Sequence, residues 1–68
     1  MKYKVGELVK WYLLYSDIAI VKDSGIGTVV RLSSYDYGDF ISNSYRVFCN
    51  NGKILNLQEN CLEKLDNN

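Results

Sequence analysis

The chain has 68 residues, of which 47% are hydrophobic, with one tryptophan, six tyrosines, two phenylalanines and no histidine. This length allows a single small domain, and the apolar share is high enough for a packed core, which argues against intrinsic disorder. Eight basic residues balance eight acidic ones, so the chain lacks the positive field of a general DNA-coating protein. Without histidine, an acid–base pair or a phosphate-binding loop, the sequence predicts a protein that is not an enzyme and needs no cofactor.

The N-terminal third contains one clear strand and one ambiguous segment. Residues 5–11 begin at a turn-forming glycine, Gly6. After it, apolar residues are interspersed with the polar Glu7 and Lys10, a pattern typical of a strand. The apolar positions of residues 12–24 fit neither the strand period of 2 nor the helix period of 3.6. We therefore expect a long excursion there, with one short strand around residues 18–21.

The middle of the chain predicts a central strand followed by a polar loop. A turn is expected at residues 22–25, where Lys-Asp-Ser-Gly combines turn-forming residue types. The run 25–32, GIGTVVRL, predicts the most secure strand, and its internal glycine indicates a bend or a close backbone approach. One face of that strand would carry Ile26, Thr28, Val30 and Leu32. Residues 33–43 are polar and rich in tyrosine, so we expect an exposed loop or hairpin tip.

The C-terminal third predicts a hairpin. Asn51-Gly52 is a strong signal for a two-residue type I′ turn, because both central positions of that turn need a positive φ. The flanking runs, residues 45–49 and 53–58, are short and apolar enough to be its strands. A single 3₁₀ turn at residues 58–60 and a short last strand at residues 61–65 would follow.

About five short strands with this spacing predict an all-β chain, specifically a small SH3-like antiparallel barrel with a 3₁₀ turn before the last strand. Residues 1–65 would form the single domain, and residues 66–68 a frayed C-terminal tail. No α-helix longer than about two turns is expected. The expected core consists of Val5, Val9, Ile26, Val30, Val47, Ile54, Leu57 and Leu62.

Several short motifs give the chain a family resemblance. They are Val5-Gly6-Glu7-Leu8-Val9, Gly25-Ile26-Gly27-x-Val29, Tyr45-Arg46-Val47 before the Asn-Gly turn, and Leu62-Glu63-Lys64-Leu65. With these motifs the chain resembles the very small SH3-like barrel proteins encoded by tailed bacteriophages, particularly those of marine cyanobacteria. The resemblance implies a fold and an origin, and either a virion accessory part or a host-interaction part. It implies no site residues, because its motifs are signatures of the fold alone.

The best candidate for a binding surface is the aromatic cluster formed by Tyr35, Tyr37 and Phe40. Tyrosine and phenylalanine supply large, rigid contact areas, which is why they concentrate in protein interfaces. Asp36 and Asp39 would give this surface an acidic rim. Two interpretations remain open: the aromatic residues form an interface, or they pack back over an open end of the barrel. The first interpretation predicts a non-catalytic protein-interaction module with a phage or host protein as its partner.

The alternative function is a small barrel that binds nucleic acid or a ribonucleoprotein in the infected host. Its candidate contact residues are Lys10, Trp11 and Lys22, because an aromatic ring beside basic residues can stack on single-stranded nucleic acid. The competing interpretation of Trp11 is packing in the core. Arg31 and Arg46 lie on expected strands, where they could face each other or pair with acidic residues.

The cysteines and the absence of targeting segments bear on location. Cys49 and Cys61 are too few for a zinc site, so we expect two reduced thiols, with a disulfide between them as the alternative. The N-terminus lacks the apolar core of a signal peptide, and the longest apolar run, residues 11–15, is too short to cross a bilayer. We expect synthesis in the host cytoplasm with no membrane association, with incorporation into the virion left open. Self-association through an edge strand is a further expectation.

Overall fold

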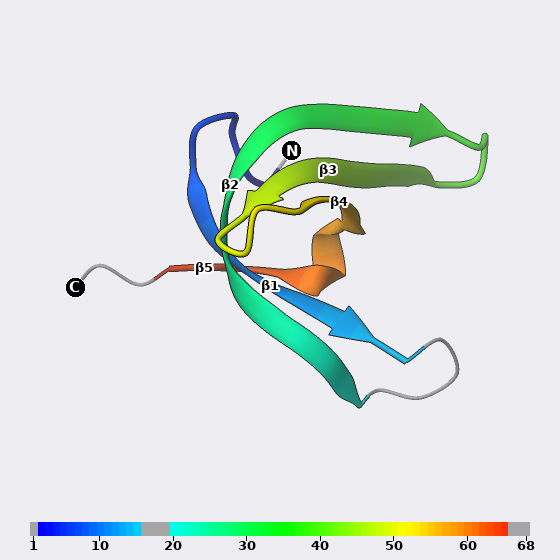
Figure 1. Ribbon diagram of the computed structural model, residues 1–68. Coiled ribbons are helices and arrows are strands. Elements are labelled where there is room, and N and C mark those ends of the chain that lie inside the picture. Colours follow the sequence, from blue (N-terminus) through cyan, green and yellow to red (C-terminus); the bar gives the residue numbers. More distant parts are fainter. Residues whose placement is uncertain (1, 16–19, 66–68) are drawn as a thin grey trace.

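The computed structural model describes residues 2–15 and 20–65, and this part of the chain is all-β. One antiparallel sheet contains β1 (Leu8–Leu14), β2 (Val21–Asp36), β3 (Ile41–Cys49), β4 (Ile54–Gln58) and β5 (Leu62–Lys64). A 3₁₀ turn, η1 (Glu59–Cys61), precedes the last strand, and the strand order is β4-β3-β2-β1-β5. The expectations of an all-β fold, five strands and a 3₁₀ turn before the last strand are confirmed. The sheet bends strongly but does not close (Figure 1).

The long strand β2 takes part in two hairpins that diverge from a common centre (Figure 1). Its first part pairs with β1, and its second part pairs with β3 as far as Asp36 and Ile41. Within β2, only Gly27 and Thr28 have register partners on both β1 and β3. The fold therefore consists of a packed centre from which two two-stranded hairpins project.

Two expectations about the strands require correction. The turn expected at residues 22–25 is wrong, because β2 runs through this segment and Gly25 pairs with Trp11 of β1. The loop expected at residues 33–43 is mostly strand, and only residues 37–40 form the hairpin tip. Residues 18 and 19 of the short strand expected at residues 18–21, and the tail at residues 66–68, lie outside the described residues.

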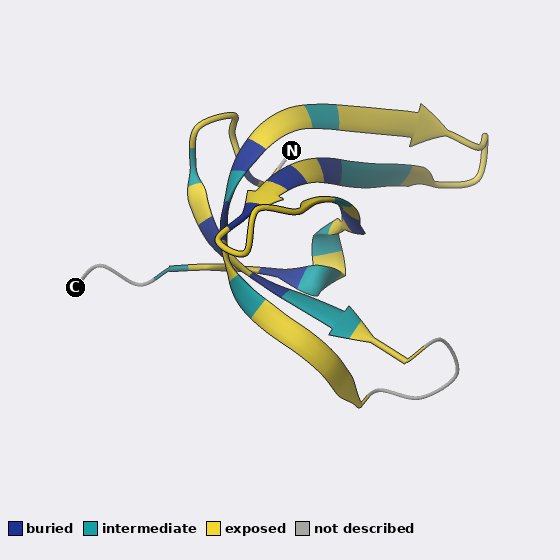
Figure 2. Cartoon of the chain, viewed as in Figure 1, coloured by how far each residue is buried: buried dark blue, intermediate teal, exposed yellow. Residues whose placement is uncertain are grey.

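The core lies at the centre of the fold, where β2 bends, while most of both hairpins is exposed (Figure 2). Four expected core residues are buried: Val9, Val47, Leu57 and Leu62. Four others were assigned wrongly, because Val5, Ile26, Val30 and Ile54 are 61%, 45%, 43% and 62% exposed. The reason for the errors in β2 is its orientation, since Gly27 and Val29 face the core and Ile26 faces outward.

A β-bulge at Val30 then changes which residues of β2 face inward. Val29 pairs with Val47 and Arg31 pairs with Arg46, so Val30 has no register partner on β3. An extra residue of this kind shifts the alternation of side chains by one position. As a result Leu32, three residues after Val29, packs against the core.

Gly27 is required by a close approach between β2 and β3. A Cβ atom at this position would lie 2.5 Å from the Cγ1 atom of Val47 and 2.8 Å from the carbonyl oxygen of Phe48. Any larger residue would have to push the two strands apart or displace Val47. The absence of a side chain therefore lets the central strand sit close to β3 at the bend.

Large aromatic residues complete the core. Trp11 and Tyr3 are each 1% exposed, and Tyr3 packs edge-on against the ring of Tyr45 at 5.3 Å between ring centroids. The Tyr3 hydroxyl donates a hydrogen bond to the carbonyl oxygen of Leu62 at 3.0 Å. The Tyr45 hydroxyl donates to the carboxylate of Glu59 in η1. These contacts join the N-terminal segment and η1 to the sheet.

The hairpin between β3 and β4 has a different turn from the one expected. Of Asn51 and Gly52, only Gly52 has a positive φ, at +87°, so the type I′ assignment is wrong. The Gly52 N–H donates to the carbonyl oxygen of Cys49, and the Cys49 N–H donates to the carbonyl oxygen of Lys53. These bonds define a three-residue loop in which a glycine with positive φ follows a turn.

Candidate protein interface on the hairpin of β2 and β3

The aromatic cluster is defined by Tyr35, Tyr37 and Phe40 at the tip of the hairpin formed by β2 and β3. The ring centroids of Tyr35 and Tyr37 are 4.8 Å apart, and those of Tyr37 and Phe40 are also 4.8 Å apart, with the latter rings stacked. The Tyr37 N–H donates to the carbonyl oxygen of Phe40 at 2.9 Å, which closes the tip. The backbone of the tip therefore holds all three rings together on one side of the hairpin.

The three rings contact one another and contribute nothing to the buried core. Tyr35, Tyr37 and Phe40 are 65%, 58% and 61% exposed, and none belongs to the core cluster. They do not act as a lid over the centre of the fold. Aromatic surface of this size at the end of a projecting hairpin is available to a binding partner.

The register of β2 and β3 extends this surface along the hairpin. Pairing is continuous from Arg31 to Asp36, so Arg31, Ser33 and Tyr35 lie on one face. Their partners on β3 are Arg46, Ser44 and Ser42, in that order. The opposite face carries Leu32 and the buried Tyr45. We call the first of these two faces, with the aromatic cluster at its end, the outer face of the hairpin.

Two arginines lie side by side at the base of the outer face. Arg31 and Arg46 are direct register partners, and both side chains are exposed. The Arg46 Nε atom donates to the Oδ1 atom of Asn56 at 3.4 Å. Within residues 2–15 and 20–65, neither guanidinium forms an ion pair with an acidic residue. Like charges directly opposite each other on a sheet are destabilising, and nothing in the described structure compensates this pair.

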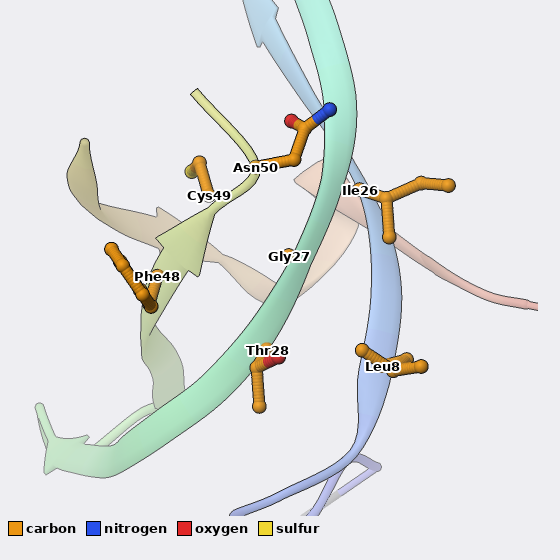
Figure 3. Close-up of a pocket in the computed structure, with 7 residues that line it drawn as sticks. All are labelled: Leu8, Ile26, Gly27, Thr28, Phe48, Cys49 and Asn50. Carbon is orange, nitrogen blue, oxygen red and sulfur yellow. The ribbon is translucent and has the colours of Figure 1, made fainter. Parts of the chain in front are cut away.

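An apolar row adjoins the arginines on the same side of the sheet. Register places Leu8, Thr28, Phe48 and Ile54 next to one another across β1, β2, β3 and β4. Phe48 is 50% exposed, and with Leu8 and Ile26 it lines a shallow depression of about 210 Å³ (Figure 3). The outer side of the sheet therefore presents aromatic, hydroxyl, basic and apolar groups in succession.

The residues expected to contact nucleic acid do not form a comparable surface. Trp11 is 1% exposed, so its ring cannot stack on a base while the core is intact. The Lys10 ammonium lies 5.5 Å from the centre of the Tyr12 ring. Lys22 is exposed on β2, four residues from Ile26, the register partner of Lys10. The interpretation of Trp11 as a core residue is the one that fits its position.

Neither thiol lies on the outer face of the hairpin, although Cys49 lines the depression beside Phe48. Cys49 is buried and Cys61 is half-buried, and neither forms a disulfide. Burial raises the pKa of the Cys49 thiol above its ordinary value, which keeps it in the unreactive protonated form. Across the described ranges, no three cysteine or acidic side chains gather closely enough to hold a metal ion.

Comparisons with protein-family models, curated proteins and solved structures found no match to this chain. None of the described residues belongs to a helix that is long and apolar enough to cross a membrane.

Proposed function

We propose that this chain is a non-catalytic protein-interaction module whose contact surface includes Tyr35, Tyr37 and Phe40. The observation that supports this proposal is that three rings in mutual contact remain more than half exposed at the tip of a projecting hairpin. Exposed aromatic surface leaves apolar area in water, and burial against a partner recovers that free energy. Tyrosine is also among the residue types that contribute most to binding affinity in protein interfaces.

The shape of the hairpin gives further support. Isolated two-stranded hairpins are marginally stable in water. Here β1 does not reach the second part of β2, and β4 accompanies β3 only as far as Ser44, so from Ser34 and Asn43 to the tip the hairpin has two strands. A partner that covers the outer face would add the contacts that a third strand or a second layer normally supplies.

The same proposal extends to fold and origin. The strand order, the strongly bent β2 and the 3₁₀ turn before β5 support an SH3-like barrel that is open along one side. The further proposal of a bacteriophage accessory protein, either virion-associated or host-interacting and made in the host cytoplasm, rests on the sequence motifs alone. Mass spectrometry of purified virions and of infected-cell lysate would distinguish these two roles.

Nucleic-acid binding has less structural support. The Lys2 N–H lies 3.4 Å from the Glu59 carboxylate, Lys10 lies over Tyr12 on β1, and Arg31 lies on the hairpin of β2 and β3. These basic residues occupy three different parts of the fold. Lys2, Lys10 and Arg31 therefore form no continuous basic patch or stripe of the kind typical of nucleic-acid binding.

The test compares binding with stability in single variants. Tyr35→Ser, Tyr37→Ser and Phe40→Ser should each abolish co-purification of the partner while leaving the melting temperature close to that of the wild type. Tyr15→Ser is the matched control, because Tyr15 is 50% exposed and lies away from this tip. Large destabilisation by all three tip variants, with unchanged binding by the folded fraction, would contradict the proposal.

A further inference from the structure

The outer face of the hairpin carries two kinds of groups that attract each other, placed at opposite ends. The aromatic cluster lies at the tip, and the Arg31–Arg46 pair lies at the base. Tyr37 lies six positions after Arg31, which corresponds to about 20 Å along a strand. Between the two ends lie only small hydroxyl residues: Ser33, Ser42 and Ser44.

We propose that the chain forms a two-fold symmetric homodimer, in which the aromatic cluster of each copy packs on the Arg31–Arg46 pair of the other. The proposal rests on the proposed function, because it identifies the partner of the same tip as a second copy of this chain. In a two-fold interface every contact occurs twice. If a residue at the tip of the first copy contacts the base of the second, the same residue of the second copy contacts the base of the first. Two antiparallel hairpins therefore bring tip to base twice.

The geometry of a single copy meets the requirement of this arrangement. Because the two copies are identical, the distance from the aromatic cluster to the Arg31–Arg46 pair is the same in both. A single antiparallel alignment of the hairpins therefore brings each aromatic cluster to the arginine pair of the other copy. The two-fold axis would pass near Ser33 and Ser44, whose small side chains allow the two hairpins to approach closely. On β2 and β3 the centre of the face carries only serine side chains, and the longer Gln58 of β4 lies to one side of Ser44.

The chemistry of the two ends is complementary. The face of an aromatic ring carries partial negative charge, and the planar guanidinium of arginine stacks on it. Asp39 adds an exposed carboxylate at the same tip, whereas Asp36 alternates onto the opposite face and accepts a hydrogen bond from the Gly38 N–H. Each dimer contact would supply negative charge to two guanidiniums that repel each other in a single copy. The chain has no net charge, so long-range repulsion does not oppose the pairing of two copies.

The adjoining apolar row can enlarge the contact. A stable interface buries about 800 Å² on each partner. The accessible surface of the chain is 5128 Å², so such an interface would cover only a small part of it. Phe48, beside Arg46 on the same side of the sheet, would extend the buried area beyond the hairpin itself. Arginine and tyrosine are among the residue types that contribute most to binding in protein interfaces.

The test is sedimentation equilibrium of the purified chain over a range of concentrations, with three variants. The wild type should show a monomer–dimer equilibrium. A base variant, Arg31→Glu with Arg46→Glu, and a tip variant, Tyr35→Ser with Tyr37→Ser, should each be monomeric over the same range. The charge control, Lys22→Glu with Lys64→Glu, makes the same change in net charge elsewhere and should dimerise like the wild type.

Mixing the base variant with the tip variant tests the crossed contacts directly. The mixture can form one intact contact, between the aromatic cluster of the base variant and the arginines of the tip variant. It should therefore associate more tightly than either variant alone and less tightly than the wild type. Fluorescence of Trp11, the sole tryptophan, checks that each variant keeps its core.

Three results would overturn the inference. The first is a wild type that stays monomeric at every concentration. The second is a dimer that survives in both variants, which would place the contact elsewhere, such as at an edge strand. The third is a mixture that associates no better than its components. A monomeric wild type whose tip variants still lose a foreign partner would overturn the dimer and leave the proposed function standing.

Discussion

Replacing Gly27 with alanine tests the close approach that shapes the centre of the fold. The added Cβ atom would lie 2.5 Å from Val47 Cγ1 and 2.8 Å from the Phe48 carbonyl oxygen, and both distances are shorter than van der Waals contact. Overpacking of this kind costs about 1–3 kcal/mol. Alanine also reduces the freedom of the unfolded chain, which offsets about 0.4–1 kcal/mol. We expect a net loss of about 1–2 kcal/mol in the free energy of unfolding.

The assay is thermal unfolding followed by circular dichroism and by Trp11 fluorescence. In a domain of this size each kcal/mol lowers Tm by roughly 4–8 °C, so the change is easily measured. The double variant Gly27→Ala with Val47→Ala removes one of the two clashing partners, and its loss should be smaller than the sum of the single losses. A Gly27→Ala variant that melts at or above the wild-type temperature would refute the reasoning.

Three further predictions concern the turn, η1 and the thiols. Gly52→Val should lower the free energy of unfolding by about 1–2 kcal/mol in thermal unfolding, because φ at this position is +87°, which valine rarely adopts. A Cβ atom there would meet no neighbouring atom, so the loss would come from the backbone conformation alone. The hydrogen bond from Tyr45 lowers the pKa of the Glu59 carboxyl, so its stabilising effect is present above the ordinary carboxyl pKa. That effect is lost as pH falls through the lowered value, and acid titration of Glu59→Gln should show a flatter stability curve. A thiol-reactive dye should label Cys61 before the buried Cys49 in the native protein, and both after denaturation.

The sequence predicted the strands that depend on local signals and failed where distant contacts decide. The hairpin of β3 and β4, η1 and β5 follow directly from short apolar runs and turn residues. The turn expected at residues 22–25 failed because Gly25 serves a different purpose, lying opposite the Trp11 ring. A turn-forming composition was overridden there by pairing with β1.

The candidate interface was predictable in part for the same reason. Three aromatic residues in a polar stretch are visible in the sequence, and the structure places them together. The pairing of Arg31 with Arg46 depends on the bulge at Val30. No residue pattern near Val30 predicts this bulge. Without that bulge the register would shift by one residue and place the two arginines out of line.

The contacts between the two ends of the chain also bear on the order of folding. The hairpins of β1 with β2, β2 with β3 and β3 with β4 join neighbouring segments, whereas β5 pairs with β1 from the far end of the chain. Closing a long loop costs entropy before its contacts form, so the pairing of β5 and the Tyr3–Leu62 hydrogen bond should form late. Changes at Tyr3 should then accelerate unfolding more than they slow folding. The kinetic lifetime of the native sheet would then depend on the contacts between the two ends of the chain, namely the pairing of β5 with β1 and the Tyr3–Leu62 hydrogen bond.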